Sequence, residues 1–194
     1  MVNSDPIRTY LSLMDAQADS FFSALPSLSH AALWGRPAGG AWSHGENLSH
    51  IAVVHRFFRR FNRALWPLAS LVARARRPGP SEATIDDVYA RPDFPHAVGR
   101  FWPPAYSIRR PVPLDRLRGA ISAEHRMVRA FYEARDPGLL GRARLYFPAI
   151  GWVSYIQSLR IAVFHDAHHF AEIRRVLAST SGSAGPDERG GDRA

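Results

Sequence analysis

The chain has 194 residues, of which 46% are apolar and 22% charged, and this composition predicts one globular domain over residues 1–180. Cysteine is absent, which excludes disulfides, thiolate metal ligands and a cysteine nucleophile. With no signal-peptide pattern and no apolar run near the ~20 residues of a membrane span, we expect a cytoplasmic protein without a membrane partner. The formal net charge is +8, but every basic residue is arginine and the arginines are spread along the chain, so we do not expect a nucleic-acid partner.

The first predicted helix runs from Pro6 to about Leu25. Proline is favoured at the first helical position, and apolar residues follow it at the three- and four-residue spacing of a buried helix face. Pro26 interrupts this pattern, and a shorter helical turn is expected up to about Trp34. The glycine-rich segment 35–40 is predicted to be a loop.

A second helix is predicted from Ser43 toward Arg77. Ser43 and Glu46 stand at the spacing of a capping box, in which each side chain bonds the backbone N–H of the other residue. Pro67 lies inside the segment and is expected to kink the helix. Four arginines share one face, which we interpret as the solvated side of an amphipathic helix; the alternative is a face that binds phosphates or acidic substrates. They are Arg56, Arg59, Arg60 and Arg63.

A long connection is predicted over residues 78–113, which are rich in proline, glycine and aspartate. Its aromatic residues are interpreted either as a lid or as anchors that pack the connection over one end of the fold. A third helix is predicted from about Pro113 until the breaker Arg135-Asp-Pro-Gly138. A loop with Tyr146 and Phe147 is expected to follow, and no strand is predicted.

The fourth predicted helix runs from about Ser154 to Ser179. The remaining segment, 181–194, has almost no apolar content and is expected to be disordered. Four long helices without strands predict an all-α four-helix bundle.

Three histidines are the candidate metal ligands. His165 and His169 are four residues apart, so a helix places them on one face. His50 comes from the second predicted helix. Three imidazoles that leave an open coordination position are typical of a catalytic rather than a structural metal site. The alternative is that these histidines line a water-filled cleft or lie near the surface.

Other residues near these histidines have weaker assignments. His168 is the alternative partner of His165. Glu172 is a candidate general base for bound water, an acceptor of a hydrogen bond from a metal-bound histidine, or an exposed carboxylate. Glu46 lies one turn before His50 on the same helix and could approach the site, although its role in the capping box explains its presence without any site. His55 is expected to face elsewhere. The remaining histidines have no partner at ligand spacing and are expected in loops or at the surface; they are His30, His44, His96 and His125.

Two segments together resemble the DinB/YfiT-like superfamily of metal-binding four-helix bundles. They are WSHGENLSHI at 42–51 and HDAHHFAEI at 165–173. The resemblance extends over about residues 4–180. It implies an up-down-down-up bundle in which His50, His165 and His169 bind a divalent metal, zinc or nickel, and it makes a homodimer an expectation. Glu172 stands where glutamine is common in the family.

The resemblance also implies a chemistry, because relatives include S-transferases that use low-molecular-weight thiols and a mycothiol-dependent isomerase. Our first hypothesis is a metal-dependent thiol S-transferase or hydrolase that acts on a small-molecule substrate. A low-molecular-weight thiol would be its cosubstrate and nucleophile. In the hydrolase alternative the nucleophile would be water, with Glu172 as the catalytic base. The alternative is a metal-binding or dimeric interaction bundle without turnover.

Overall fold

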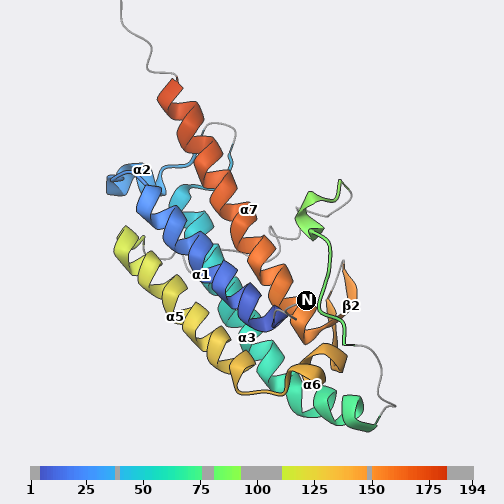
Figure 1. Cartoon of the computed structure of the whole chain (residues 1–194). Helices are drawn as coiled ribbons and strands as arrows, with labels where there is room; N and C mark the ends of the chain where they lie inside the picture. The colour runs from blue at the N-terminus through green and yellow to red at the C-terminus, as the bar shows by residue number, and fades with distance from the viewer. Residues whose placement is uncertain (1–4, 38–39, 76–80, 93–110, 148–149, 183–194) are drawn as a thin grey trace, which may run out of the picture.

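Four long helices form the body of the computed structural model (Figure 1), which describes residues 5–37, 40–75, 81–92, 111–147 and 150–182. They confirm the predicted all-α class. These helices are α1 (Pro6–Ala24), α3 (His44–Ala75), α5 (Leu114–Glu133) and α7 (Tyr155–Gly182). The shorter elements are α2 (His30–Trp34), the 3₁₀ helix η1 (Val88–Ala90), α6 (Pro137–Arg142), β1 (Arg144–Phe147) and β2 (Gly151–Ser154).

The predicted starts of the first two long helices are confirmed by their caps. The side chain of Asp5 accepts a hydrogen bond from the Ile7 N–H, and Pro6 occupies the first turn of α1. At α3, the Glu46 N–H donates to Ser43 Oγ at 3.1 Å, and the Ser43 N–H donates to Glu46 Oε2 at 2.7 Å. These bonds satisfy N–H groups that a helix start otherwise leaves unpaired.

The directions of the helices follow from the contacts between them. Contacts advance in the same sense along α1 and α7, and along α3 and α5, so each of these pairs is parallel. Contacts between α3 and α7 advance in opposite senses. The order is therefore up, down, down, up, as Figure 1 shows. The contacts are Gln17–Val163 and Phe21–Phe170, then Arg56–Glu124 and Asn62–Tyr132, and finally Asn47–His169 and Asn62–Ser158.

A layer of buried polar residues crosses the bundle between two apolar clusters. On α7, Val163 belongs to the cluster near α6 and Phe170 to the cluster near α2. On α5, Ile121 and Val128 belong to different clusters in the same way. Between these flanking residues the chain buries polar side chains, namely Glu124, His125, His165, Asp166 and His169.

The prediction that the chain has no strand is wrong. β1 and β2 pair antiparallel, with Leu145 opposite Val153 and Tyr146 opposite Trp152. Leu145 and Val153 are buried, whereas Tyr146 and Trp152 lie on the exposed face with their rings in edge contact. Each strand has four residues, too few for an alternating pattern to stand out in the sequence, and the cross-strand pairs stabilise the hairpin.

The helix-breaking segment Arg135-Asp-Pro-Gly138 also begins α6, a helix that the sequence patterns do not predict. The side chain of Asp136 accepts from the Leu139 N–H at 2.6 Å, and Pro137 takes the first helical position of α6. The same residues that stop α5 therefore start α6. Helix α3 continues through Pro67 to Ala75. The aromatic residues of 94–106 lie outside the described residues. The predicted disordered tail, 181–194, begins too early, because residues 181 and 182 belong to α7; the rest of it also lies outside the described residues.

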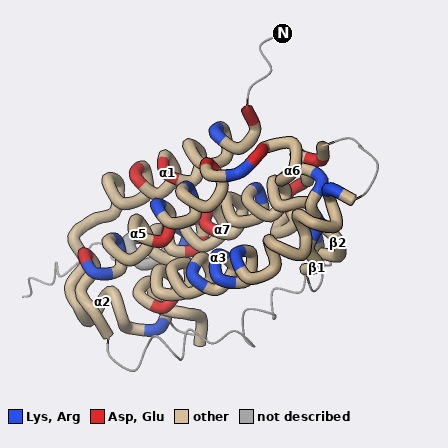
Figure 2. Tube along the Cα trace, turned by 90° about the horizontal axis from the view of Figure 1, so that it is seen from below, with Lys and Arg blue, Asp and Glu red and all other residues tan. Residues whose placement is uncertain are grey.

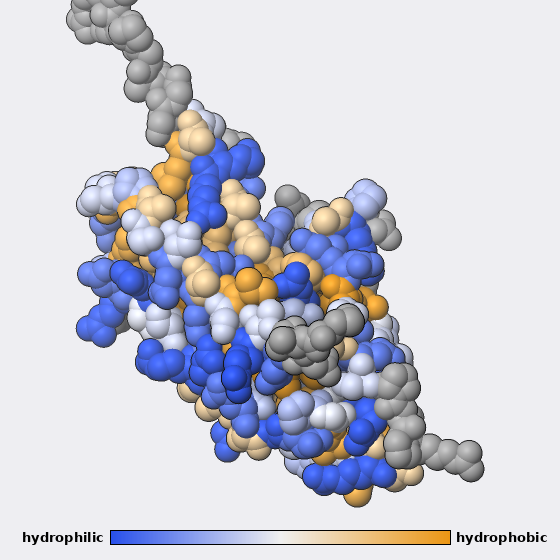
Figure 3. Space-filling model, in the orientation of Figure 1, coloured by the Kyte–Doolittle hydropathy of each residue, from blue (hydrophilic) through white to orange (hydrophobic). Residues whose placement is uncertain are grey.

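The arginines of α3 recur along one side of the helix (Figure 2). Arg56, Arg60 and Arg63 are exposed, as predicted, but Arg59 is half-buried. Hydrophilic residues cover much of the face in Figure 3, and apolar residues lie between them. Among the described helices, none is both long and apolar enough to cross a membrane.

Candidate metal centre

The structure brings His50, His165 and His169 together inside the bundle. α3 contributes His50, and α7 contributes the other two from successive turns. The ring centroid of His50 lies 5.1 Å from that of His165 and 4.7 Å from that of His169, and the last two lie 4.6 Å apart. Each ring offers one nitrogen, and these nitrogens lie within 4.8 Å of one another. All three side chains are buried.

Two ring nitrogens of this cluster have no hydrogen-bond partner. They are His50 Nδ1 and His165 Nε2, and both are buried. A buried polar atom without a partner costs about 1–3 kcal/mol, so such an atom needs an explanation. A metal ion that accepts imidazole nitrogens would supply one. The donor set of three neutral imidazoles suits zinc or nickel, and it therefore fits the ion that the family resemblance implies.

The surroundings keep these imidazoles neutral. Burial lowers the pKa of His50 to about 3, with help from His165 and against the opposing effect of Asp166. Burial also lowers the pKa of His165, and burial with the neighbouring histidines lowers the pKa of His169 well below its ordinary value. Because a metal binds the unprotonated nitrogen, the site needs no loss of protons at neutral pH.

Neighbouring side chains hold these rings. His169 Nδ1 lies 2.9 Å from Asn47 Oδ1, and His165 Nδ1 lies 3.2 Å from Asp166 Oδ1. Trp42 lies against the cluster, with its ring centroid 4.9 Å from that of His50 and its plane nearly parallel to that of His169. The side chains that hold these rings therefore come from α3, from α7 and from the segment that precedes α3.

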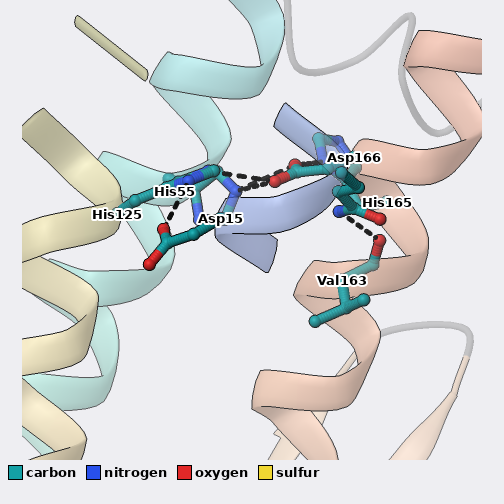
Figure 4. A network of polar contacts seen from close by, with 7 residues as sticks. Asp15, His55, His125, Val163, His165 and Asp166 are labelled. Atoms are coloured by element: carbon teal, nitrogen blue, oxygen red, sulfur yellow. Dashed lines mark hydrogen bonds and ion pairs between the residues drawn. The ribbon is translucent and has the colours of Figure 1, made fainter. Parts of the chain in front are cut away.

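A second buried cluster, formed by His55, His125 and Asp166, adjoins the first (Figure 4). His55 Nε2 lies 2.8 Å from both oxygens of Asp166, and His125 Nε2 lies 3.1 Å from Oδ2. On the far side of His125, Nδ1 lies 3.4 Å from Asp15 Oδ1. These three residues also have the composition of a metal site, but their own contacts already satisfy the carboxylate.

A family model described as the DinB superfamily matches residues 13–173, well over half of the chain. The chain belongs to the DinB superfamily. The DinB match includes both segments on which the resemblance rests and all three clustered histidines. Searches of curated proteins and of solved structures gave no match.

Three other candidate residues from the sequence analysis lie outside the cluster of three. Glu172 is half-buried, and Arg175 donates to both of its carboxylate oxygens, at 2.6 and 3.1 Å. His168 stacks on Tyr89, which η1 places beside it with ring centroids 5.1 Å apart. Glu46 is occupied by its helix cap and by Arg36.

The second cluster is not predicted from the sequence. His125 was expected at the surface or in a loop, but it is buried in α5; His44 is likewise buried, at the start of α3. The signal was present on α5, because Glu124 and His125 stand between Ile121 and Val128 on an apolar helix face. His55, which is expected to face elsewhere, contacts Asp166, and its ring centroid lies 6.4 Å from that of His165. His30 is exposed, and His96 lies outside the described residues.

A small cavity lies between α3, α5 and α7 beside His165. Its volume is about 40 Å³, enough for a few water molecules and not for a substrate. Asn62, whose Oδ1 is buried without a hydrogen-bond partner, lies in its wall.

Proposed function

We propose that the chain is a divalent-metal-dependent enzyme in which His50, His165 and His169 hold the ion and a low-molecular-weight thiol or water is the nucleophile. The observation that carries the proposal is the buried cluster itself, with neutral imidazoles from two helices and two ring nitrogens that lack a partner. Three protein ligands leave room for a further group on the ion, as in catalytic sites. Such an ion supplies one kind of chemistry, deprotonation of a thiol or water at neutral pH.

The residues of the chain divide the remaining work. The imidazoles orient the ion, and Trp42 covers the rings of His50 and His169. In thiol transfer, the sulfur bonds to the electrophilic carbon of the substrate while the bond to the leaving group breaks, and the S–H proton passes to a base. The absence of cysteine in the chain fits a thiol that comes from outside.

We propose Glu172 as that base. Its pKa is lowered, first by the hydrogen bonds from Arg175, so it is a carboxylate that can accept a proton at neutral pH. The ion pair with Arg175 lies at the surface and is therefore weak enough to open. The test is Glu172→Gln, which should lower the rate constant for turnover and leave metal content unchanged.

The proposal is tested with zinc- or nickel-loaded protein, a panel of low-molecular-weight thiols and 1-chloro-2,4-dinitrobenzene, from which the thiol displaces chloride. We expect turnover by the wild type and by His30→Ala, whose histidine is exposed on α2. His50→Ala should keep its helical circular dichroism and lose turnover. Two results together would contradict the proposal: His50→Ala loses its fold, and the metal-loaded wild type turns over no thiol. They would favour a bundle that binds metal for stability alone.

A further inference from the structure

The carboxylate of Asp166 contacts the imidazole rings of three histidines. Its side chain is fully buried, and ring nitrogens of His55, His125 and His165 lie within 3.2 Å of its oxygens. An ionised carboxylate only accepts hydrogen bonds, so each ring nitrogen that faces it must carry a hydrogen. For His165 this nitrogen is Nδ1. A neutral imidazole has one N–H, and the lone pair of His165 therefore lies on Nε2, the atom that is buried without a partner.

His169 is constrained in the same way by Asn47. The Asn47 Nδ2 donates to the Ser43 carbonyl oxygen at 3.0 Å, which leaves Oδ1 as the amide atom that faces His169 Nδ1 at 2.9 Å. An amide oxygen cannot donate, so His169 Nδ1 carries the hydrogen and Nε2 the lone pair. The orientation of Asn47 is itself fixed by the residue that caps α3.

We propose that Asp166 and Asn47 are positioning residues that hold His165 and His169 as Nδ1–H tautomers and so reserve both Nε2 atoms for a metal ion. This inference rests on the proposed metal site. Outer partners that fix the tautomer of a metal-binding histidine typically change metal affinity by about 10–100-fold when they are removed.

The second cluster then has a role without an ion of its own. His55 comes from α3 and His125 from α5, so the two rings fix the Asp166 carboxylate from two helices (Figure 4). His125 in turn faces Asp15 of α1, which also accepts from Arg129 at 2.6 Å. The network thus links residues of all four long helices on one side of His165. Because it holds the Asp166 carboxylate in place, it also holds the His165 ring that donates to that carboxylate.

The tautomers are measured directly in metal-free wild-type protein. Long-range ¹H–¹⁵N spectra of histidine-labelled protein distinguish the Nδ1–H from the Nε2–H form, and His165→Gln and His169→Gln assign the two signals. We expect both residues in the Nδ1–H form. The Nε2–H form at either residue would overturn the proposal for that residue. This measurement does not depend on metal binding or on turnover.

Zinc affinity of the variants tests the consequence. With a competing chelator, Asp166→Ala and Asn47→Ala should weaken zinc binding by about 10–100-fold. The matched controls are Asp19→Ala, which removes an exposed carboxylate of α1, and Asn62→Ala, which removes a buried amide of α3 that bonds Tyr132 and Ser158. Both controls should bind zinc as the wild type does.

The outcomes separate the two proposals. A wild type that binds no zinc contradicts the proposed function, and the spectra still decide the tautomers. A wild type that binds zinc, with unchanged affinity in folded Asp166→Ala and Asn47→Ala, overturns the positioning role. Two zinc ions per chain, one of them lost in Asp166→Ala, would make Asp166 a ligand and would also overturn it.

Discussion

His55 Nε2 lies 2.8 Å from both carboxylate oxygens of Asp166, although 111 residues separate the two along the chain. Burial alone would raise the pKa of Asp166, but His55 and the other two histidines hold it well below its ordinary value. Burial would lower the pKa of His55, but Asp166 and Glu124 raise it. The two residues therefore form a buried ion pair that joins α3 to α7 beside the candidate metal centre.

Loss of this pair should destabilise the fold. His55→Ala leaves the Asp166 carboxylate without its nearest partner, and breaking a buried ion pair costs about 3–5 kcal/mol. Urea denaturation measures the free energy of unfolding. The exposed His30→Ala serves as the control and should unfold as the wild type does. A loss in His55→Ala as small as that of the control would show that His125 and His165 alone satisfy Asp166.

The clustered histidines should make the metal-free protein less stable in acid. The folded pKa of His169 lies well below its ordinary value of 6.5, so below pH 6.5 the unfolded chain binds a proton that the folded chain excludes. The stability that this histidine contributes is thus present above pH 6.5 and is lost as the pH falls. His169→Gln should reduce the slope of unfolding free energy against pH by about 1.4 kcal/mol per pH unit in mildly acidic buffer.

The measurement is urea denaturation in chelator between neutral and mildly acidic pH. His30→Gln, an exposed substitution of the same kind, should leave the slope unchanged. Equal slopes for the wild type and His169→Gln would mean that His169 takes up its proton in the folded protein as readily as in the unfolded chain.

The two arginines that hold Glu124 should contribute unequally. Arg59 and Arg56 each donate to one oxygen of this buried carboxylate, and their side chains are 16% and 49% exposed. A hydrogen bond to a charged group contributes about 1.5–3 kcal/mol, less where water can replace the donor. We expect Arg59→Ala to cost about that range and Arg56→Ala clearly less, by chemical denaturation. The reverse order would contradict this account.

The cap of α3 should stabilise the helix that carries His50. Ser43→Ala removes the oxygen that accepts from the Glu46 N–H, and such a change costs about 1 kcal/mol. Ser29 caps the short, exposed α2 in the same manner, through the Ala32 N–H. Ser29→Ala should therefore have a smaller effect on the midpoint of thermal unfolding. Equal effects would mean that the start of α3 frays without cost to the core.

Local spacing predicts the long helices and the pair His165 and His169, whereas His50 joins that pair only through the packing of α3 against α7. His165 and His169 share a face in any helix, and the cap at Ser43 fixes where the helix of His50 begins. The network around Asp166 depends instead on contacts across 41 and 111 residues, between helices whose neighbours a single sequence does not reveal. Periodicity places His125 on a buried face but does not say which side chain it meets there.

The helix α6 and the strands β1 and β2 are not predicted from the sequence, for a different reason. Asp136-Pro-Gly138 has the chemistry of both a helix stop and a helix start, and the structure uses both. In the hairpin, Leu145 and Val153 are buried by the bundle rather than by the strands themselves. A four-residue strand gains its stability from such packing, which the local sequence does not record.

Metal content of the untagged protein tests the central claim most directly. Mass spectrometry of the wild type after incubation with zinc or nickel and removal of free ion should give close to one ion per chain, and His169→Ala should lose it. His30→Ala, which leaves the cluster intact, should keep it. A wild type that retains no zinc and no nickel would contradict the account, and His50, His165 and His169 would then be packing residues of the bundle.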